Sequence, residues 1–500
     1  MTMINHSHSS KRAKVVRFTL KKALGYCKKI TRLAYHGIIF IPLWINRRVL
    51  SLLDHYSRII HLVSLQFSYS EKLQTLCSSV EYLPPDTDED YSKHPACLII
   101  ALSTCTSEPR VLRECELMRS CGVMPIVVSM PATAVEPNHN TLFYRVPIYM
   151  MLTKNYPNLK RLYSLLFSLL KSTRLAILVF LSENLFFDLL LTVESLRWLS
   201  DEYDIRLIIA HDYYAYPAGL VARNLFSAPL CFDIHEHALS QYRTKHFIKN
   251  IYPYLLKFHG LFLKNADLLG VVSPGILKAL ESDFSFIQGK TFLLRNLPLM
   301  SIQSKSFSGD LPSSLNNQSS KYKLLYSGLI TSGRGLTKLL QSVPLLSANF
   351  ELTLLGPIAS DAGNFVQTIK DLQNSGYYVN LLPPVPFDEL ISFCSYFDVG
   401  YLVQDLVGPQ KQYSLANKFF EYIHAGLCLC VDSSIEMSRI VTQHDLGIII
   451  PSPHSAESIA SALNALSFSE IQHYKNNSKL ASPHYEFRAD ASPLVHIVQK

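Results

Sequence analysis

The chain has 500 residues and a mass of 56.6 kDa, which is more than one hydrophobic core usually organises. Its composition, 48% hydrophobic and 17% charged, excludes an intrinsically disordered protein and predicts two globular domains with an appendage. The ten cysteines contain no Cys-x-x-Cys pair, so their spacing supports neither a zinc site nor a disulfide framework, and a reducing compartment fits best.

The net charge of +8 belongs to the N-terminal part of the chain. Residues 1–80 hold thirteen Lys and Arg side chains against only Asp54 and Glu71. The remaining residues carry slightly more acidic than basic side chains, so the body of the protein has no general attraction for polyanions. We therefore expect no nucleic acid partner.

The basic segment at residues 1–80 has the pattern of an amphipathic helix. Apolar or small residues recur there at steps of three and four beside a stripe of Lys and Arg, and Trp44 follows in a short apolar run. This composition is typical of a chain that lies in the lipid interface. We expect residues 11–60 to bind an anionic membrane surface, with the protein in the cytoplasm on the inner face of the membrane.

Other interpretations of this segment are weaker. Arg47, Arg48 and Asp54 interrupt the apolar run before it reaches the roughly 18 residues that a membrane-spanning helix needs. A secretory signal does not fit, because the basic region is long and no small-residue cleavage site follows the apolar stretch. A re-entrant hairpin, or a basic helix docked on the body or on nucleic acid, stays an alternative.

An acidic connector at residues 81–95 precedes a change of pattern. The region 96–300 opens with the apolar run ACLIIALS, the helical stretch PRVLRECELMRSCG and a second apolar run, VMPIVVSM. Later apolar runs, IRLIIAHD and APLCFDIHEH, again alternate with a helix and end in polar residues. Continuous apolar strands that alternate with helices predict a parallel sheet covered on both faces, with ligands at the carboxyl ends of its strands.

A second α/β pattern follows at residues 321–470. Between the two patterns, residues 301–320 are rich in serine and lack apolar periodicity, which predicts a linker or mobile loop. The tail, 471–500, is expected to pack back on the first domain. The fold class is thus α/β, with two doubly wound Rossmann-like domains that face a central cleft, the usual place for a ligand.

Two motifs of the second half point to a nucleotide. In YSGLITSGRGL, Gly328 ends a strand and lets the backbone approach a ligand, and Arg334 can neutralise a diphosphate at the start of the next helix. In SLANKFFEYIHAG, Asn417, Lys418 and Glu421 fall in the opening turns of a helix between two strands. A carboxylate at that place can accept both hydroxyls of a ribose.

Polar side chains also gather at two strand ends of the first half. Asp233, His235 and His237 alternate and so face one side, a set that would also suit a metal ion. His211 and Asp212 end the preceding strand, where they either line the same site or satisfy buried loop amides.

Taken together, these motifs resemble the GT-B fold glycosyltransferases of the large family-four type (glycosyl transferase group 1). The resemblance covers residues 96–470, and its pieces occur in the family's order, among them EPRVLRECELMRSCG, CFDIHEH and NKFFEYIHAGLCLCVD. It implies transfer of a sugar from a nucleotide diphosphate donor to an acceptor hydroxyl, with retained anomeric configuration and without a metal or other cofactor. From the basic N-terminal segment, we expect a lipid-linked or cell-envelope glycan as the acceptor.

The resemblance also implies roles for single residues. Glu421 corresponds to the glutamate that holds the donor ribose, and Arg334 to the Lys or Arg that contacts the diphosphate, with Lys418 assisting. His235 corresponds to the histidine of the first domain that faces the transferred sugar. Glu236 follows it in the His-Glu variant of this motif.

Some positions depart from the family's pattern. Tyr413 stands where the first glutamate of the usual E-x7-E motif would be, and Leu329 stands where an arginine is frequent, which leaves more of the diphosphate charge to Arg334. Glu108 and Arg110 belong to a loop expected near the acceptor entrance. Two alternatives therefore stay open, a catalytically degenerate GT-B scaffold at a membrane and a sugar-nucleotide epimerase of similar fold.

Overall fold

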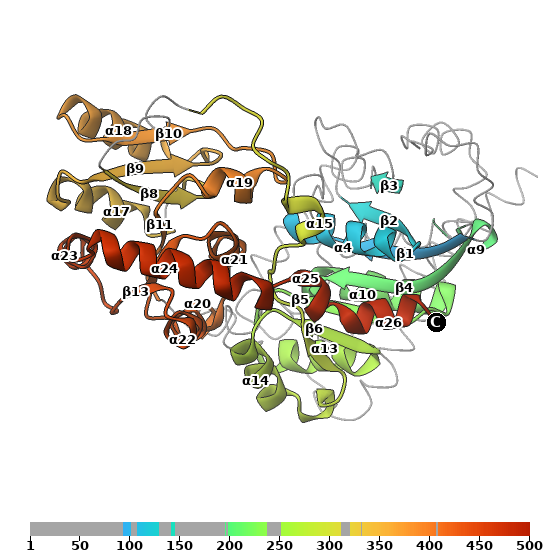
Figure 1. Ribbon diagram of the computed structural model, residues 1–500. Helices are drawn as coiled ribbons and strands as arrows, with labels where there is room; N and C mark the ends of the chain where they lie inside the picture. The colour runs from blue at the N-terminus through green and yellow to red at the C-terminus, as the bar shows by residue number, and fades with distance from the viewer. Residues whose placement is uncertain are drawn as a thin grey trace, which may run out of the picture. The chain divides into compact units, whose positions relative to one another are not determined.

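The computed structural model describes residues 94–101, 108–129, 142–145, 196, 199–237, 252–311, 321–331, 333–406 and 409–500, which all belong to one compact unit. The predicted membrane-associating segment at 1–80 and nearly all of the connector at 81–95 lie outside these residues. In the described ranges, no helix is both long and apolar enough to cross a membrane. Both predicted α/β halves are present, each with a fully parallel sheet (Figure 1).

The first sheet has seven strands in the order β3-β2-β1-β4-β5-β6-β7. The strands are β1 (His94–Ile100), β2 (Met124–Ser129), β3 (Leu142–Arg145), β4 (Tyr203–His211), β5 (Leu230–Ile234), β6 (Leu268–Val271) and β7 (Thr291–Leu293). The helices are α4 (Pro109–Ser120), α9 (Leu199–Glu202), α10 (Asp212–Phe226), α13 (Tyr252–Asn265), α14 (Pro274–Asp283), the 3-10 turn η1 (Ser285–Ile287) and α15 (Met300–Gln303). The strand order reverses between β1 and β4, which makes the carboxyl ends of these strands the expected ligand site.

The second sheet has six strands in the order β10-β9-β8-β11-β12-β13, so its order reverses between β8 and β11. The strands are β8 (Tyr322–Ser327), β9 (Phe350–Leu355), β10 (Val379–Leu382), β11 (Val399–Leu402), β12 (Cys428–Asp432) and β13 (Gly447–Ile450). The helices are α17 (Leu336–Ser342), η2 (Val343–Leu345), α18 (Gly363–Asn374), α19 (Leu390–Cys394), α20 (Pro409–Tyr413), α21 (Asn417–His424), α22 (Ile435–His444), α23 (Ala456–Asn464), α24 (Phe468–Ala481), η3 (Ser482–His484), α25 (Phe487–Asp490) and α26 (Ser492–Val498).

Strand β1 shows why long apolar runs form the strands of this protein. Cys97 and Ile99 belong to the hydrophobic cluster that contains residues of α4 and α26. Leu98 and Ile100 belong instead to the cluster that contains residues of α10 and α13. Helices thus cover both faces of the sheet, as the continuous apolar runs predicted.

The chain returns to the first half after it has completed the second sheet. Helix α24 contacts β12, and α26 contacts β4 and α4, where it lies as a red ribbon beside the green strand (Figure 1). Leu494 and Val498 of α26 are buried in the same cluster as Cys97. Residues 492–498 are therefore part of the core of the first half.

Part of the predicted serine-rich linker at 301–320 makes specific contacts. The ring of Phe307 lies edge-on to Phe393 of α19, with 4.8 Å between the ring centroids. The hydroxyl of Ser308 donates a hydrogen bond of 2.8 Å to Glu389. Residues 312–320 lie outside the described part. The packing of one partly buried phenylalanine can thus fix a segment whose serine content suggested mobility.

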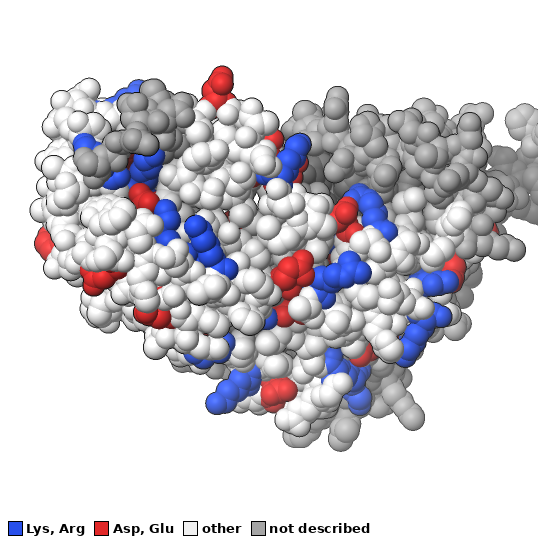
Figure 2. All heavy atoms as spheres, in the orientation of Figure 1, with Lys and Arg blue, Asp and Glu red and all other residues white. Residues whose placement is uncertain are grey.

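Charged side chains are interspersed on the face of the molecule seen in Figure 2, where blue Lys and Arg atoms and red Asp and Glu atoms alternate among uncharged ones. This pattern agrees with the near balance of charge in the sequence after residue 80.

Gly335, the N-cap residue of α17, has a strict steric requirement. Its φ is +78°, and a Cβ would lie 1.9 Å from the carbonyl oxygen of Val403. Gly333 has the same φ of +78°, but its Cβ would meet nothing within 4 Å in the described structure. We expect Gly333→Ala to cost only the left-handed strain of about 1 to 2 kcal/mol, and Gly335→Ala to cost clearly more.

Chemical denaturation of the two variants measures this difference in the free energy of unfolding. Equal losses would contradict the expectation, because they would mean that the contact with Val403 relaxes without cost.

Candidate functional site

His235 directly follows β5 and lies between two carboxylates. Its Nε2 is 2.7 Å from Oδ2 of Asp233, and its Nδ1 is 3.2 Å from Oδ2 of Asp212. Burial lowers the pKa of His235, but Asp233 and Asp212 raise it by more, to about 10. The ring is therefore a cation at neutral pH, and its side chain is still 20% exposed.

Arg110 of α4 anchors Asp233 from within the protein. Its Nε and Nη2 donate to the two oxygens of the Asp233 carboxylate, and both side chains are buried. Nη2 also donates to the carbonyl oxygen of Leu294 at 2.6 Å. Burial raises the pKa of Asp233, but Arg110 and His235 hold it well below its usual range. The arginine expected near the acceptor entrance is thus a buried anchor of the histidine site.

His211, the last residue of β4, extends this network. Its Nε2 is 2.8 Å from Oε2 of the buried Glu114, and its Nδ1 is 3.3 Å from Oδ2 of Asp233. Burial lowers the pKa of His211, but Glu114 and Asp233 raise it overall. His211 therefore contacts the carboxylate that orients His235, rather than only satisfying loop amides.

The alternating set Asp233, His235 and His237 does not stay together. His237 turns to Asp283 of α14, with 3.1 Å between Nε2 and Oδ2, and its backbone amide donates to Oε1 of Gln410 at 2.9 Å. This separation argues against the metal site that the alternation would have allowed.

Two other groups in the described ranges bring carboxylate and histidine atoms within 4.8 Å of one another. They are Glu108, His211 and His235, and Glu114, His211 and Asp233. In the second group, both oxygens of Asp233 already accept hydrogen bonds from Arg110. A metal ion there would have to compete with that guanidinium.

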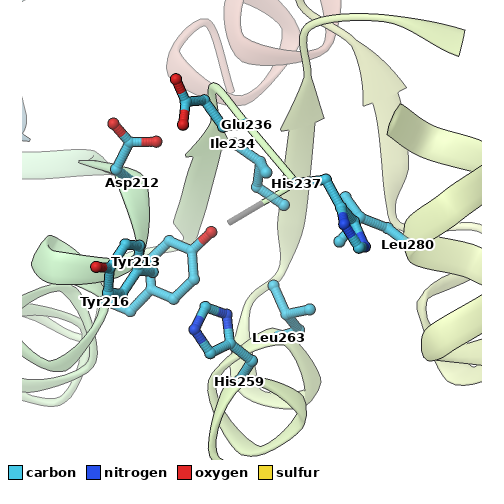
Figure 3. Close-up of a pocket in the computed structure, with 9 residues that line it drawn as sticks. All are labelled: Asp212, Tyr213, Tyr216, Ile234, Glu236, His237, His259, Leu263 and Leu280. Atoms are coloured by element: carbon cyan, nitrogen blue, oxygen red, sulfur yellow. The ribbon is translucent and has the colours of Figure 1, made fainter. Parts of the chain in front are cut away.

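A small pocket in the first half adjoins His235 (Figure 3). It is lined by Asp212, Tyr213, Tyr216, Ile234, Glu236, His237, His259, Leu263 and Leu280. In the view of Figure 3, Asp212 and Glu236 lie at one end, and His259 and Leu263 lie at the other. Burial raises the pKa of Glu236, and Asp212 adds to this rise. Burial, with His237, lowers the pKa of His259 to about 3, so His259 is neutral.

Lys418 and Glu421 form the central pair of the second half, three residues apart on α21. Burial raises the pKa of Glu421, which is 4% exposed, to about 7 against the opposing charges of Arg113 and Lys418. Burial lowers the pKa of Lys418 to about 7, and Arg334 adds to this shift. A carboxylate and an amine that both titrate near neutral pH are typical of a functional site.

Gly328 opens space beside this pair. Its φ is +119°, and a Cβ would lie 3.6 Å from Nζ of Lys418. The same Nζ lies 3.7 Å from the centroid of the Tyr326 ring. The predicted glycine therefore lies next to the predicted lysine at the carboxyl end of β8, the expected ligand edge of the sheet.

Three cations gather around this edge. Arg334 is exposed in the loop before α17, and Lys411 of α20 donates to Oε1 of Gln404 at 2.7 Å. Burial is the main cause that lowers the pKa of Lys411 and of Lys418, and the positive charge of Arg334 is the second cause for both. Such a group of cations suits a diphosphate. Sequence reasoning missed Lys411, although it stands only two residues before Tyr413, the position of the missing first glutamate.

The predicted residues of the two halves are linked electrostatically. Glu236 and Lys411 each affect the pKa of the other. Asn417, expected to line the nucleotide site, instead accepts a hydrogen bond of 2.5 Å through Oδ1 from Nη2 of Arg113. Its role in nucleotide binding stays a prediction.

Tyr413, at the position of the missing first glutamate, covers the start of α14. A Cβ on Gly275 would lie 2.2 Å from Cδ1 of Tyr413, and the tyrosine packs against the hydrophobic cluster of the first half. The ring thus replaces a carboxylate with a packing contact.

The family model described as glycosyl transferase 4-like domain matches residues 107–291. No curated protein sequence matches the chain.

Several solved structures share the fold. Sucrose-phosphate synthase from Thermosynechococcus elongatus has 15% identity and a TM-score of 0.60, over 81% of this chain and 98% of that one. HepE from Anabaena, solved in complex with UDP and glucose, has 13% identity and a TM-score of 0.54, over 81% and 99%. WaaG, a glycosyltransferase involved in lipopolysaccharide biosynthesis, has 10% identity and a TM-score of 0.50, over 80% and 99%. At these identities the likeness shows the fold, which is GT-B. The family model adds that residues 107–291 match the glycosyl transferase 4-like domain.

Proposed function

We propose that the protein transfers a hexose from a uridine diphosphate donor to an acceptor hydroxyl, with retention of configuration. The observation that carries this proposal is the buried Glu421 beside Lys418 and Arg334 at the carboxyl end of the second sheet. In the proposed complex, the carboxylate of Glu421 accepts hydrogen bonds from both ribose hydroxyls. The complex of HepE with UDP and glucose supports the choice of uridine.

The cations of the site stabilise the departing diphosphate. Arg334, Lys411 and Lys418 supply positive charge where negative charge develops, which is the electrostatic form of catalysis that such transfers require. No resident metal is needed in this scheme, because the three side chains provide the counter-charge. The donor phosphate then takes the proton of the acceptor hydroxyl.

His235 faces the transferred sugar in this proposal. Its Nε2 stays on the buried Asp233, whereas its Nδ1 faces Asp212, which is 42% exposed and more distant at 3.2 Å. A sugar hydroxyl can therefore replace Asp212 and accept a hydrogen bond from Nδ1. Glu236, which lines the pocket in Figure 3, is proposed to face the incoming acceptor.

The acceptor is proposed to be a lipid-linked or cell-envelope glycan. The basic composition of residues 11–60 supports this choice, because it suits attachment to the anionic inner face of a membrane. WaaG, which shares the fold, is involved in lipopolysaccharide biosynthesis, and this also supports the choice.

Calorimetric titration of the full chain with UDP, GDP, ADP and dTDP tests the donor. We expect UDP to bind, and Arg334→Ala to weaken it roughly 10-fold or more, the loss of one charge-assisted hydrogen bond of about 1.5 to 3 kcal/mol. Lys370→Ala on α18, where the lysine is exposed, is the matched control and is expected to bind as the wild type does.

Other outcomes separate the alternatives. Binding of no nucleotide would contradict the enzyme proposal. It would favour the catalytically degenerate scaffold, the alternative that Leu329 and Tyr413 suggest. Conversion of a UDP-sugar without any acceptor would favour an epimerase.

A further inference from the structure

Arg113 is a buried arginine that the proposed reaction does not use. It lies on α4 of the first half and is 0% exposed. Its Nη2 donates to Oδ1 of Asn417 at 2.5 Å, and its Nη1 makes only a long contact of 3.5 Å with the carbonyl oxygen of Asn296. Its Nε has no hydrogen-bond partner among the described residues. A buried cation with so few hydrogen bonds lowers the stability of the fold unless a nearby anion balances its charge.

The charge of Arg113 acts chiefly on Glu421. Burial lowers the pKa of Arg113 to about 10, and Glu421 is the foremost charge that opposes this shift. In return, Arg113 is the foremost charge that lowers the pKa of Glu421, ahead of Lys418. Arg110, three residues earlier on α4, has a different anion, because it binds Asp233 through both oxygens.

We propose that Arg113 is a positioning residue for the donor nucleotide: from the first half, it keeps the ribose-binding carboxylate of Glu421 ionised and orients the start of α21 through Asn417. This inference rests on the proposed role of Glu421. Arg113 does not touch the donor in it, and acts only through Glu421 and Asn417.

The ionised form matters because only a carboxylate offers both oxygens as acceptors to the two ribose hydroxyls, whereas a carboxylic acid must place a proton on one of them. Glu421 has a pKa of about 7, so a modest change in its surroundings decides its charge at neutral pH.

Few other groups can supply the charge. Lys418, on the same helix, itself has a pKa of about 7 and loses its proton as the pH rises. Cys394 of α19, whose thiol pKa is raised by burial and by Glu421, is neutral in this range. Arg113 is therefore the cation that persists beside Glu421 on the alkaline side of neutrality.

The test is the pH dependence of UDP binding, measured calorimetrically from about pH 6 to about pH 9, on the full chain. For the wild type, affinity is expected to fall as the pH drops below about 7, where Glu421 becomes protonated. Arg113→Met keeps most of the side-chain volume and removes the charge, so we expect the midpoint of this fall to move to higher pH by one unit or more. At pH 7, a shift of one unit lowers the ionised fraction of Glu421 from about one half to about one tenth, which corresponds to roughly 5-fold weaker binding.

Two variants control the measurement. Glu421→Gln cannot titrate at this position, so its profile reports the other groups that titrate near neutral pH, which are the nucleotide phosphate and Lys418. Arg119→Met changes a partly exposed arginine on the same helix, which pairs with Glu116, and is expected to leave the profile unchanged.

Arg113→Lys keeps a cation without the guanidinium fork, and covers the case in which Arg113→Met does not fold. Its midpoint is expected to stay near that of the wild type, even if the affinity falls. A uniform loss of affinity in Arg113→Met with an unchanged midpoint, or a raised midpoint in Arg113→Lys, would overturn the inference. Failure of the wild type to bind any nucleotide would instead overturn the proposed function.

Discussion

Glu421→Gln is expected to weaken UDP binding roughly 100-fold or more, because two hydrogen bonds to a charged acceptor, each worth about 1.5 to 3 kcal/mol, lose the charge that strengthens them. The glutamine also presents its NH2 group to one ribose hydroxyl, so this hydroxyl no longer has an acceptor oxygen for its hydrogen bond. Sugar transfer is expected to fall at least as much. Calorimetry with UDP and a radiolabelled donor assay measure the two effects.

Glu351→Gln is the matched control for this substitution. Glu351 and Glu421 are both 4% exposed, and both belong to the second half. Oε1 of Glu351 accepts from Nδ2 of Asn380 at 2.7 Å, a bond that the amide oxygen of glutamine can keep. We expect this variant to bind UDP normally. Equal weakening in both variants would contradict the ribose role of Glu421 and point to a general loss of the fold.

Arg110→Met is expected to lower the free energy of unfolding by about 3 to 5 kcal/mol. The substitution removes one partner of a buried ion pair and leaves Asp233 without its guanidinium in the interior, which is the costly way to break such a pair. The hydrogen bond to the carbonyl oxygen of Leu294 is lost as well. Urea unfolding, followed by circular dichroism, measures the loss.

An exposed pair of the same type provides the control. Arg223 binds Asp267 through Nε and Nη2 at 2.9 and 3.0 Å, and both side chains are 38% exposed. Because solvent screens such a pair, Arg223→Met is expected to cost about 1 kcal/mol or less. If Arg110→Met cost no more than Arg223→Met, the buried pair would not be the structural anchor of His235.

The architecture of both halves follows from patterns that are visible in the sequence. The run Ala96 to Ala101, which includes most of β1, is an example: it is apolar and buried throughout. Only a sheet with helices on both faces buries such a run completely. The proximity of Lys418 and Glu421 is also visible in the sequence, because one helix carries both residues three positions apart. Local sequence therefore predicts the relative positions of residues that lie on the same helix or strand.

What the sequence does not reveal depends on contacts between distant elements. Arg110, Arg113 and Arg119 look alike on one helix, yet they meet Asp233, Asn417 and Glu116 respectively. No local pattern distinguishes these environments, because the first two are set by elements more than a hundred residues away. The sequence does not reveal the charge state of His235 either, because this charge depends on the network that Arg110 and Asp233 form.

Helix α26 determines the order in which this fold can be completed during synthesis. The ribosome makes the strands of the first half early, but Leu494 and Val498, which belong to the same core as Cys97 and Ile99, emerge only after the whole second sheet. The second half can close its own sheet first, with α24 on β12 following directly. Until α26 arrives, the nascent first half carries an uncovered apolar surface, so the half that is translated first is the half that finishes folding last.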